Sequence, residues 1–80
     1  MKSNFRVVEA TDDHYVLFNN VTDTELIFDD KYRFVKGARV IENQVFDCLA
    51  TYDQTVECAA VIFDFVYEQA FGDKNEDGTI

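Results

Sequence analysis

The sequence predicts an α+β fold in which an antiparallel meander of four to six short strands is followed by one C-terminal amphipathic helix packed on one face. Short β-branched and apolar segments recur about every 8–12 residues between turn-forming residues. After residue 55 the apolar period lengthens to that of an α-helix. The 80 residues are 48% hydrophobic, too apolar for a disordered chain. We expect residues 1–72 to form a single domain and residues 73–80 to form a flexible acidic tail.

Six segments have the composition of short strands. Each is rich in Val, Ile, Phe, Tyr or Thr, which suit a pleated sheet, and each stops at Asp, Asn or Gly. Gly37 is the natural bulge or turn between two of them, and Asn43-Gln44 is the next tight connection. The predicted strands are residues 5–11, 14–18, 24–28, 31–36, 38–42 and 45–52.

Residues 55–71 are predicted to form the helix. Asp53 is the expected N-cap, since its carboxylate can accept from free amides of the first turn, and Gly72 is the expected stop. At about 100° per residue, Val61 and Phe65 are expected to border the acidic side of the helix rather than face the sheet. The residues expected to face the sheet are Ala59, Ile62, Phe63, Val66 and Ala70, with Val56 and Tyr67 at the border.

The charge balance is strongly acidic, with 16 Asp and Glu against 7 Lys and Arg and a net charge of -9. Nucleic acids and anionic lipids are held by Lys and Arg, so direct binding to either is not expected. No Lys or Arg occurs between Arg39 and Lys74. A helix without opposite charges at i,i+4 tolerates self-repulsion, which is typical of proteins that meet a basic partner or rely on charge for solubility.

Four acids share one side of the predicted helix, within about 60° of one another and opposite its apolar side. The two pairs Asp53–Glu57 and Asp64–Glu68 each span about 6 Å along the axis, with about 10 Å between the pairs. Phosphates along a nucleic-acid strand have comparable separations, so such a row suits a groove of Lys and Arg. The predicted partner-binding residues are Asp53, Glu57, Asp64, Glu68, Asp29, Asp30 and Phe65.

These features favour a non-catalytic protein that binds and inhibits a basic, nucleic-acid-binding protein by mimicking a phosphate backbone. In size and charge the chain resembles small acidic inhibitors from phages and mobile elements, such as anti-CRISPR and anti-restriction proteins. Aromatic residues left outside a thin core, such as Tyr15, Tyr52 and Phe65, would supply the anchors of the interface. The alternative is a structural or regulatory interaction module, in one form a homodimer, whose acids serve solubility.

Catalysis is not expected, because nucleophile chemistry lacks its parts. Ser3 is the only serine and His14 the only histidine, and nothing in the sequence brings His14 to Cys48 or Cys58. No Cys-x-x-Cys, His-x-x-x-His or Gly-rich phosphate-binding motif is present, and no cofactor is expected. Two cysteines are too few for a disulfide framework, and the residues after Met1 do not resemble a signal peptide. We therefore expect a cytoplasmic protein with Cys48 and Cys58 as buried thiols, a bridge between them being the alternative.

The last eight residues carry a local pattern of oxygen ligands. Asp73, Asn75 and Asp77 are spaced like the first, third and fifth ligands of a calcium loop, with Gly78 at the turn and Ile80 at the eighth position. This segment resembles the beginning of an EF-hand loop. The bidentate Glu that the family has at the twelfth position is missing, so we expect a frayed terminus rather than a metal site. Weak calcium binding is the alternative.

Overall fold

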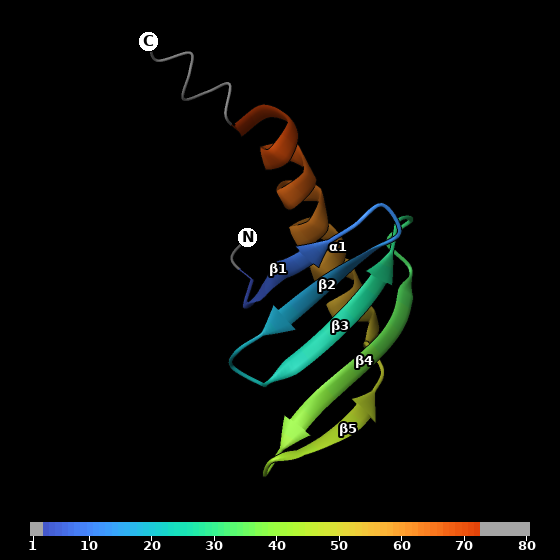
Figure 1. Ribbon diagram of the computed structural model, residues 1–80, viewed down its shortest axis with the longest axis vertical. Coiled ribbons are helices and arrows are strands. Elements are labelled where there is room, and N and C mark those ends of the chain that lie inside the picture. Colours follow the sequence, from blue (N-terminus) through green and yellow to red (C-terminus); the bar gives the residue numbers. More distant parts are fainter. Residues whose placement is uncertain (1–2, 73–80) are drawn as a thin grey trace.

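The computed structural model describes residues 3–72 of the chain. A twisted sheet lies in front of one long helix (Figure 1). The elements are β1 (Phe5–Ala10), β2 (His14–Asn19), β3 (Thr24–Asp29), β4 (Phe34–Ile41), β5 (Gln44–Cys48), α1 (Tyr52–Tyr67) and a π-helical segment, η1 (Glu68–Gly72), that continues α1 without a break.

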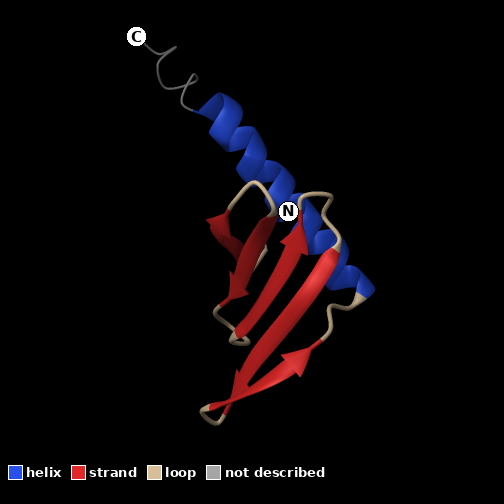
Figure 2. Ribbon diagram, turned by 45° about the vertical axis from the view of Figure 1, so that its right-hand side comes forward, coloured by secondary structure: helices blue, strands red, loops and turns tan. Residues whose placement is uncertain are grey.

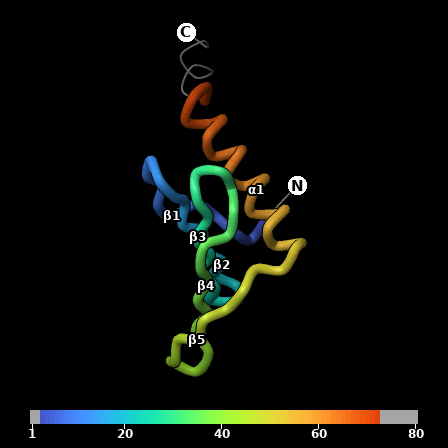
Figure 3. The backbone as a smooth tube through the Cα atoms, turned by 90° about the vertical axis from the view of Figure 1, so that its right-hand side faces the viewer, coloured from blue at the N-terminus to red at the C-terminus, as the bar shows by residue number. Residues whose placement is uncertain are grey.

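The sheet is a five-stranded antiparallel meander in the order β1-β2-β3-β4-β5. Spatial order equals chain order because each strand pairs with the one that precedes it. The helix lies on one face of the sheet (Figures 2 and 3). The predicted α+β fold, an antiparallel meander followed by a C-terminal helix, is therefore confirmed.

The core lies between α1 and the first three strands. The cross-strand partners Leu17 and Leu26 lie in one row with Gly37, so all three face the helix. Burying one large aliphatic side chain contributes roughly 1.5–3 kcal/mol. Because the core is so small, the loss of one such side chain would remove a large part of the stability. The cluster of buried apolar side chains consists of Phe5, Leu17, Leu26, Phe28, Cys58 and Ile62.

Gly37 lies inside a continuous strand, and the prediction that it divides two strands is wrong. A Cβ atom at this position would lie 2.7 Å from the carbonyl oxygen of Cys48 and 2.8 Å from Cδ2 of Leu26. Glycine is required here because β4 passes closely between β5 and a core side chain. The irregularity in β4 is at Val35, which is skipped where Ile27 pairs with Lys36 and Phe28 with Phe34.

Both turns that flank β4 differ from the sequence prediction. Residues 31–33, predicted as strand, belong to the β3–β4 turn, and Tyr32 has a positive φ of 65°. The β4–β5 turn is made by Glu42 and Asn43, with φ of 52° and 67°, one residue earlier than predicted. Two positive φ values in a two-residue hairpin loop match the twist of the strands that they join.

Thr51, not Asp53, is the N-cap of α1. Its hydroxyl accepts from the amide of Gln54 at 3.0 Å, while the Gln54 side chain accepts from the amide of Thr51 at 2.9 Å. The N-cap of this reciprocal capping box lies two residues before the predicted cap, and α1 begins at Tyr52. Asp53 consequently lies in the first turn, where its charge faces the positive end of the helix dipole.

The helix is rotated relative to the sequence prediction. Ile62 is buried as predicted, but so is Cys58, which was not assigned to the core face, and Val61 and Phe65, which were expected outside that face, are partly buried. Of the residues expected in the core, Phe63, Val66 and Ala70 are exposed. The apolar period does not distinguish two adjacent apolar sides of one helix. In the structure the sheet covers the side that contains Cys58 and Ile62.

Replacing Gly37 with Ala is expected to destabilise the domain by about 1–3 kcal/mol, because the new methyl group meets a backbone carbonyl that cannot move away. Urea unfolding followed by circular dichroism measures the effect. Ala38→Ser is the matched control, since Ala38 points to the opposite face and should change stability by no more than about 0.5 kcal/mol. Equal stability of Gly37→Ala and the parent protein would contradict the close approach.

Candidate protein-interaction surface

The helix formed by α1 and η1 extends well beyond the sheet. In Figures 1, 2 and 3 it crosses the sheet obliquely, and its C-terminal half projects past the strands. Ile62 is the last buried residue of the helix, and every residue from Phe63 to Phe71 except Phe65 is exposed. The projecting half therefore presents most of its circumference to solvent.

Three of the four acids predicted to form a row are exposed on this helix: Asp53, Asp64 and Glu68. Among residues 3–72, ion pairs form only between Glu9 and His14 and between Asp29 and Arg33, so no cation neutralises these three carboxylates within that range. Asp64 and Glu68 are four residues apart and about 6 Å apart along the axis. The structure thus leaves an uncompensated negative edge along the helix.

Glu57 does not belong to that exposed edge. It is half-buried, and its carboxylate accepts a hydrogen bond from the hydroxyl of Ser3. The Ser3 hydroxyl in turn accepts from the amide of Phe5 at 3.0 Å. Glu57 therefore connects α1 to the beginning of β1, and the predicted row is interrupted between Asp53 and Asp64.

Asp29 organises the β3–β4 turn. Its carboxylate accepts from the amides of Lys31 at 2.8 Å and Arg33 at 2.9 Å, and from Nε of Arg33 at 2.9 Å. The hydrogen bond from the Arg33 amide is the main reason that the pKa of Asp29 lies below its usual value. The neighbouring Asp30 is exposed. Of these two predicted binding residues, Asp29 already has partners within its own turn.

A second apolar side of α1 and η1 is exposed except at Ala59, which is half-buried. Its members follow one another at alternating intervals of four and three residues, the spacing of a coiled-coil seam. Tyr52 is 81% exposed and Phe63 62% exposed. We call this strip the open seam, and it consists of Tyr52, Val56, Ala59, Phe63, Val66 and Ala70.

The aromatic residues predicted as interface anchors differ in their accessibility. Tyr15 is partly buried and its ring contacts that of Tyr32 edge to face at 6.1 Å. Phe65 is also partly buried. Tyr52 alone among the three predicted anchors is fully available, and Phe63 is an exposed aromatic that the sequence prediction assigned to the core. Nothing in the period of the helix distinguished Phe63 from a core residue.

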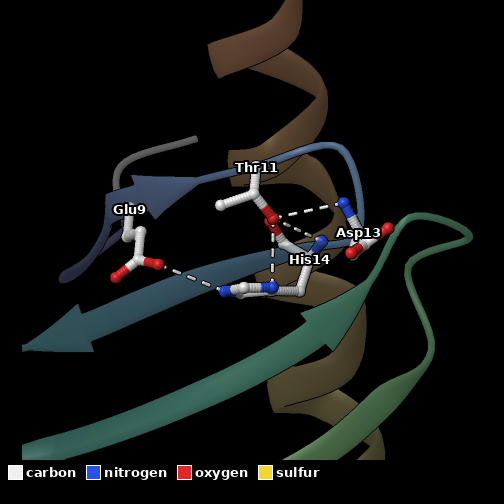
Figure 4. A network of polar contacts seen from close by, with 4 residues as sticks. All are labelled: Glu9, Thr11, Asp13 and His14. Atoms are coloured by element: carbon white, nitrogen blue, oxygen red, sulfur yellow. Dashed lines mark hydrogen bonds and ion pairs between the residues drawn. The ribbon is translucent and has the colours of Figure 1, made fainter.

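The ring of His14 has polar partners on β1 and in the β1–β2 turn (Figure 4). Nε2 of His14 lies 3.3 Å from a carboxylate oxygen of Glu9, and Nδ1 lies 3.0 Å from the hydroxyl of Thr11. Both cysteines are free thiols, Cys48 half-buried and Cys58 buried. Burial, assisted by the charge of Glu57, raises the pKa of Cys58 to about 12.

Residues 3–72 enclose no pocket, and no group of three or more His, Cys, Asp or Glu side chains within them is placed to hold a metal ion. No helix in that range has the length and apolar content to cross a membrane. Asp73, Asn75 and Asp77, the ligands of the EF-hand-like segment, lie outside the described residues.

Comparison of the chain with protein-family models, with curated proteins and with solved structures found no match.

The hydrogen bonds of Asp29 predict a specific dependence of stability on acid. Because its pKa is lower in the folded state than its value of about 3.9 in an unfolded chain, its stabilising contribution is present above that value and is lost as the pH falls through the folded-state pKa. Asp29→Ala should therefore reduce the free energy of unfolding at pH 7 and have a smaller effect near pH 2. Urea unfolding at both pH values measures this difference.

Asp30→Ala serves as the control for that experiment, because Asp30 is exposed and adjacent in sequence. It should change stability little at either pH. A penalty for Asp29→Ala that stays constant between the two pH values would show that the ionised carboxylate does not stabilise the turn.

The two thiols are expected to differ in reactivity. With a pKa of about 12 and no exposed surface, Cys58 should react with a disulfide reagent at pH 8 only when the protein unfolds. Cys48 should react at least about tenfold faster in the native state, because it is only half-buried. Thiol titration with and without urea measures the two reaction rates. Comparing the parent protein with Cys48→Ser and Cys58→Ser assigns each rate to one cysteine. Rapid native modification of Cys48→Ser would contradict the burial of Cys58.

Proposed function

We propose that this domain is a non-catalytic, cytoplasmic protein that binds a basic, nucleic-acid-binding protein and inhibits it by occupying the surface that receives the phosphate backbone. The observation that carries the proposal is the negative edge of α1 and η1, formed by Asp53, Asp64 and Glu68, with which no Lys or Arg among residues 3–72 forms an ion pair. A field of one sign steers a partner of the opposite sign and is strongest where no counter-charge lies nearby.

The separation of Asp64 and Glu68 supports the phosphate-like part of the proposal. Two acidic residues about 6 Å apart along the axis, on one side of a helix, can be contacted by two Lys or Arg side chains from a groove that otherwise follows a nucleic-acid strand. Asp53 extends the negative edge by about 16 Å beyond Asp64. The withdrawal of Glu57 toward Ser3 leaves these as separate contact points rather than a continuous row.

A second candidate is a structural or regulatory module that pairs with a copy of itself. The observation that favours it is the open seam, because exposed apolar side chains at coiled-coil spacing commonly meet a second helix. In this case the acids would serve solubility. Sedimentation equilibrium measures the mass of the particle and separates this function from the first.

The proposed inhibition predicts that neutralising the negative edge abolishes capture of a DNA-binding partner. The immobilised protein is exposed to bacterial proteins previously eluted from a DNA column, and the retained proteins are identified by mass spectrometry. Asp53→Asn, Asp64→Asn and Glu68→Gln combined should lower retention at least about tenfold. Duplex DNA and high salt should release the partner from the parent protein.

The matched control combines Asp12→Asn, Asp13→Asn and Asp23→Asn, which remove the same charge from exposed turns. It should retain the partner, and circular dichroism should show both triple variants folded. If both triple variants lost the partner equally, retention would depend on the total charge of the protein and not on the acids of the helix. A partner that duplex DNA fails to release would contradict competition for the phosphate site.

A further inference from the structure

We propose that the open seam binds an amphipathic helix of the partner, one with aliphatic residues along its centre and Lys or Arg along one margin. This inference rests on the proposed function and specifies the element of the basic partner that the domain holds.

The spacing of the open seam fits a helical occupant. Successive members are four, three, four, three and four residues apart, so they stay on one side of a helix over five turns. An extended strand would need partners at intervals of two residues, and a loop would need a pocket, which residues 3–72 do not provide. Side chains at this spacing interlock with those of a second helix crossing at about 20°.

The composition of the open seam provides both anchors and holes. Phe63 and Tyr52 are large, exposed and held on a rigid element, which is typical of residues that dominate binding energy. Ala59 and Ala70 are small and leave room between the larger side chains for the knobs of an opposing helix. A partner with branched aliphatic residues at its central positions complements this alternation of large and small.

The charges beside the open seam determine which helix it fits. Asp53 lies one turn from Val56 of the open seam, while Asp64 lies one turn from Tyr67, an exposed side chain between Asp64 and the open seam, so carboxylates follow one margin of the strip. From Tyr52 to Gly72 there are four acids and no Lys or Arg. A basic margin on the occupant would complement this edge.

A second copy of this chain is the less suitable occupant. It would bring four more carboxylates and no cation to the same contact, and each chain carries a net charge of -9. Like charges brought together across an interface disfavour that pairing relative to a basic partner. The same negative edge that selects a cationic helix therefore acts against self-association.

Three synthetic helical peptides test the proposal. One has Leu at central heptad positions and Lys at one margin; a second has the same composition in a scrambled order without an apolar side; a third replaces Lys with Glu. Binding is followed by fluorescence anisotropy of the labelled peptide. The Leu/Lys peptide should bind more tightly than either of the others by at least about tenfold.

Variants of the protein locate the contact. Phe63→Ser with Val66→Ser should weaken binding of the Leu/Lys peptide at least about tenfold, since these truncations remove an exposed anchor and its neighbour. Val45→Ser with Leu49→Ser is the matched control, because these residues are 69% and 83% exposed but lie on and beyond β5. The control should bind like the parent protein, and circular dichroism should show both variants folded.

The results that overturn the inference differ from those that overturn the proposed function. Equal affinity for the ordered and scrambled Lys peptides would show that charge alone holds the partner, leaving the inhibitor function intact. A Leu/Lys peptide that binds more weakly than about 1 mM would exclude the helical occupant. A dimer in sedimentation equilibrium that Phe63→Ser with Val66→Ser dissociates would assign the open seam to a second copy. The proposed function would instead be contradicted if duplex DNA failed to release the captured partner.

Discussion

The packing of α1 against the first three strands is the contact on which the rest of the structure depends. Cys58 and Ile62 complete a buried cluster whose other members come from β1, β2 and β3: Leu17, Leu26 and Phe28, which are fully buried, and Phe5, which is 4% exposed. An antiparallel sheet with one uncovered apolar face is not stable in water, so the helix must lie where it does. The same contact sets the rotation of the helix, and that rotation determines which of its residues lie on the outer surface.

The apolar part of the α1 surface is wider than the sheet can cover, so some of its apolar side chains stay exposed. One side, with Cys58 and Ile62, is used by the core, while an adjacent side, with Phe63 and Val66, is left exposed along the part that projects past the sheet. Exposed apolar strips of this extent on small domains usually mark contacts with other molecules. The proposed function and the proposed helical occupant both involve this exposed strip. The function depends on the acids at its border, and the occupant binds the apolar side chains at its centre.

Acidic residues that look alike in the sequence have distinct tasks in the fold. Asp29 holds a turn together by accepting from two amides and a guanidinium, and Glu57 joins the helix to the first strand through Ser3. Asp64 and Glu68 have no cation within salt-bridge distance among the described residues. Only acids of the last kind add to the field that an approaching partner meets, so net charge alone overstates the interaction surface.

The sequence by itself determined the α+β class, the meander and the position of the helix, because a change of apolar period is a local property of the chain. It also placed the acids on one side of the helix. The rotation of that helix was decided by tertiary structure, since Cys58 and Phe63 belong to apolar sides of similar character and only contact with Leu17, Leu26 and Phe28 selects between them. Tertiary structure likewise made Gly37 part of a continuous strand, because the nearby carbonyl of Cys48 and the side chain of Leu26 come from segments distant in the chain.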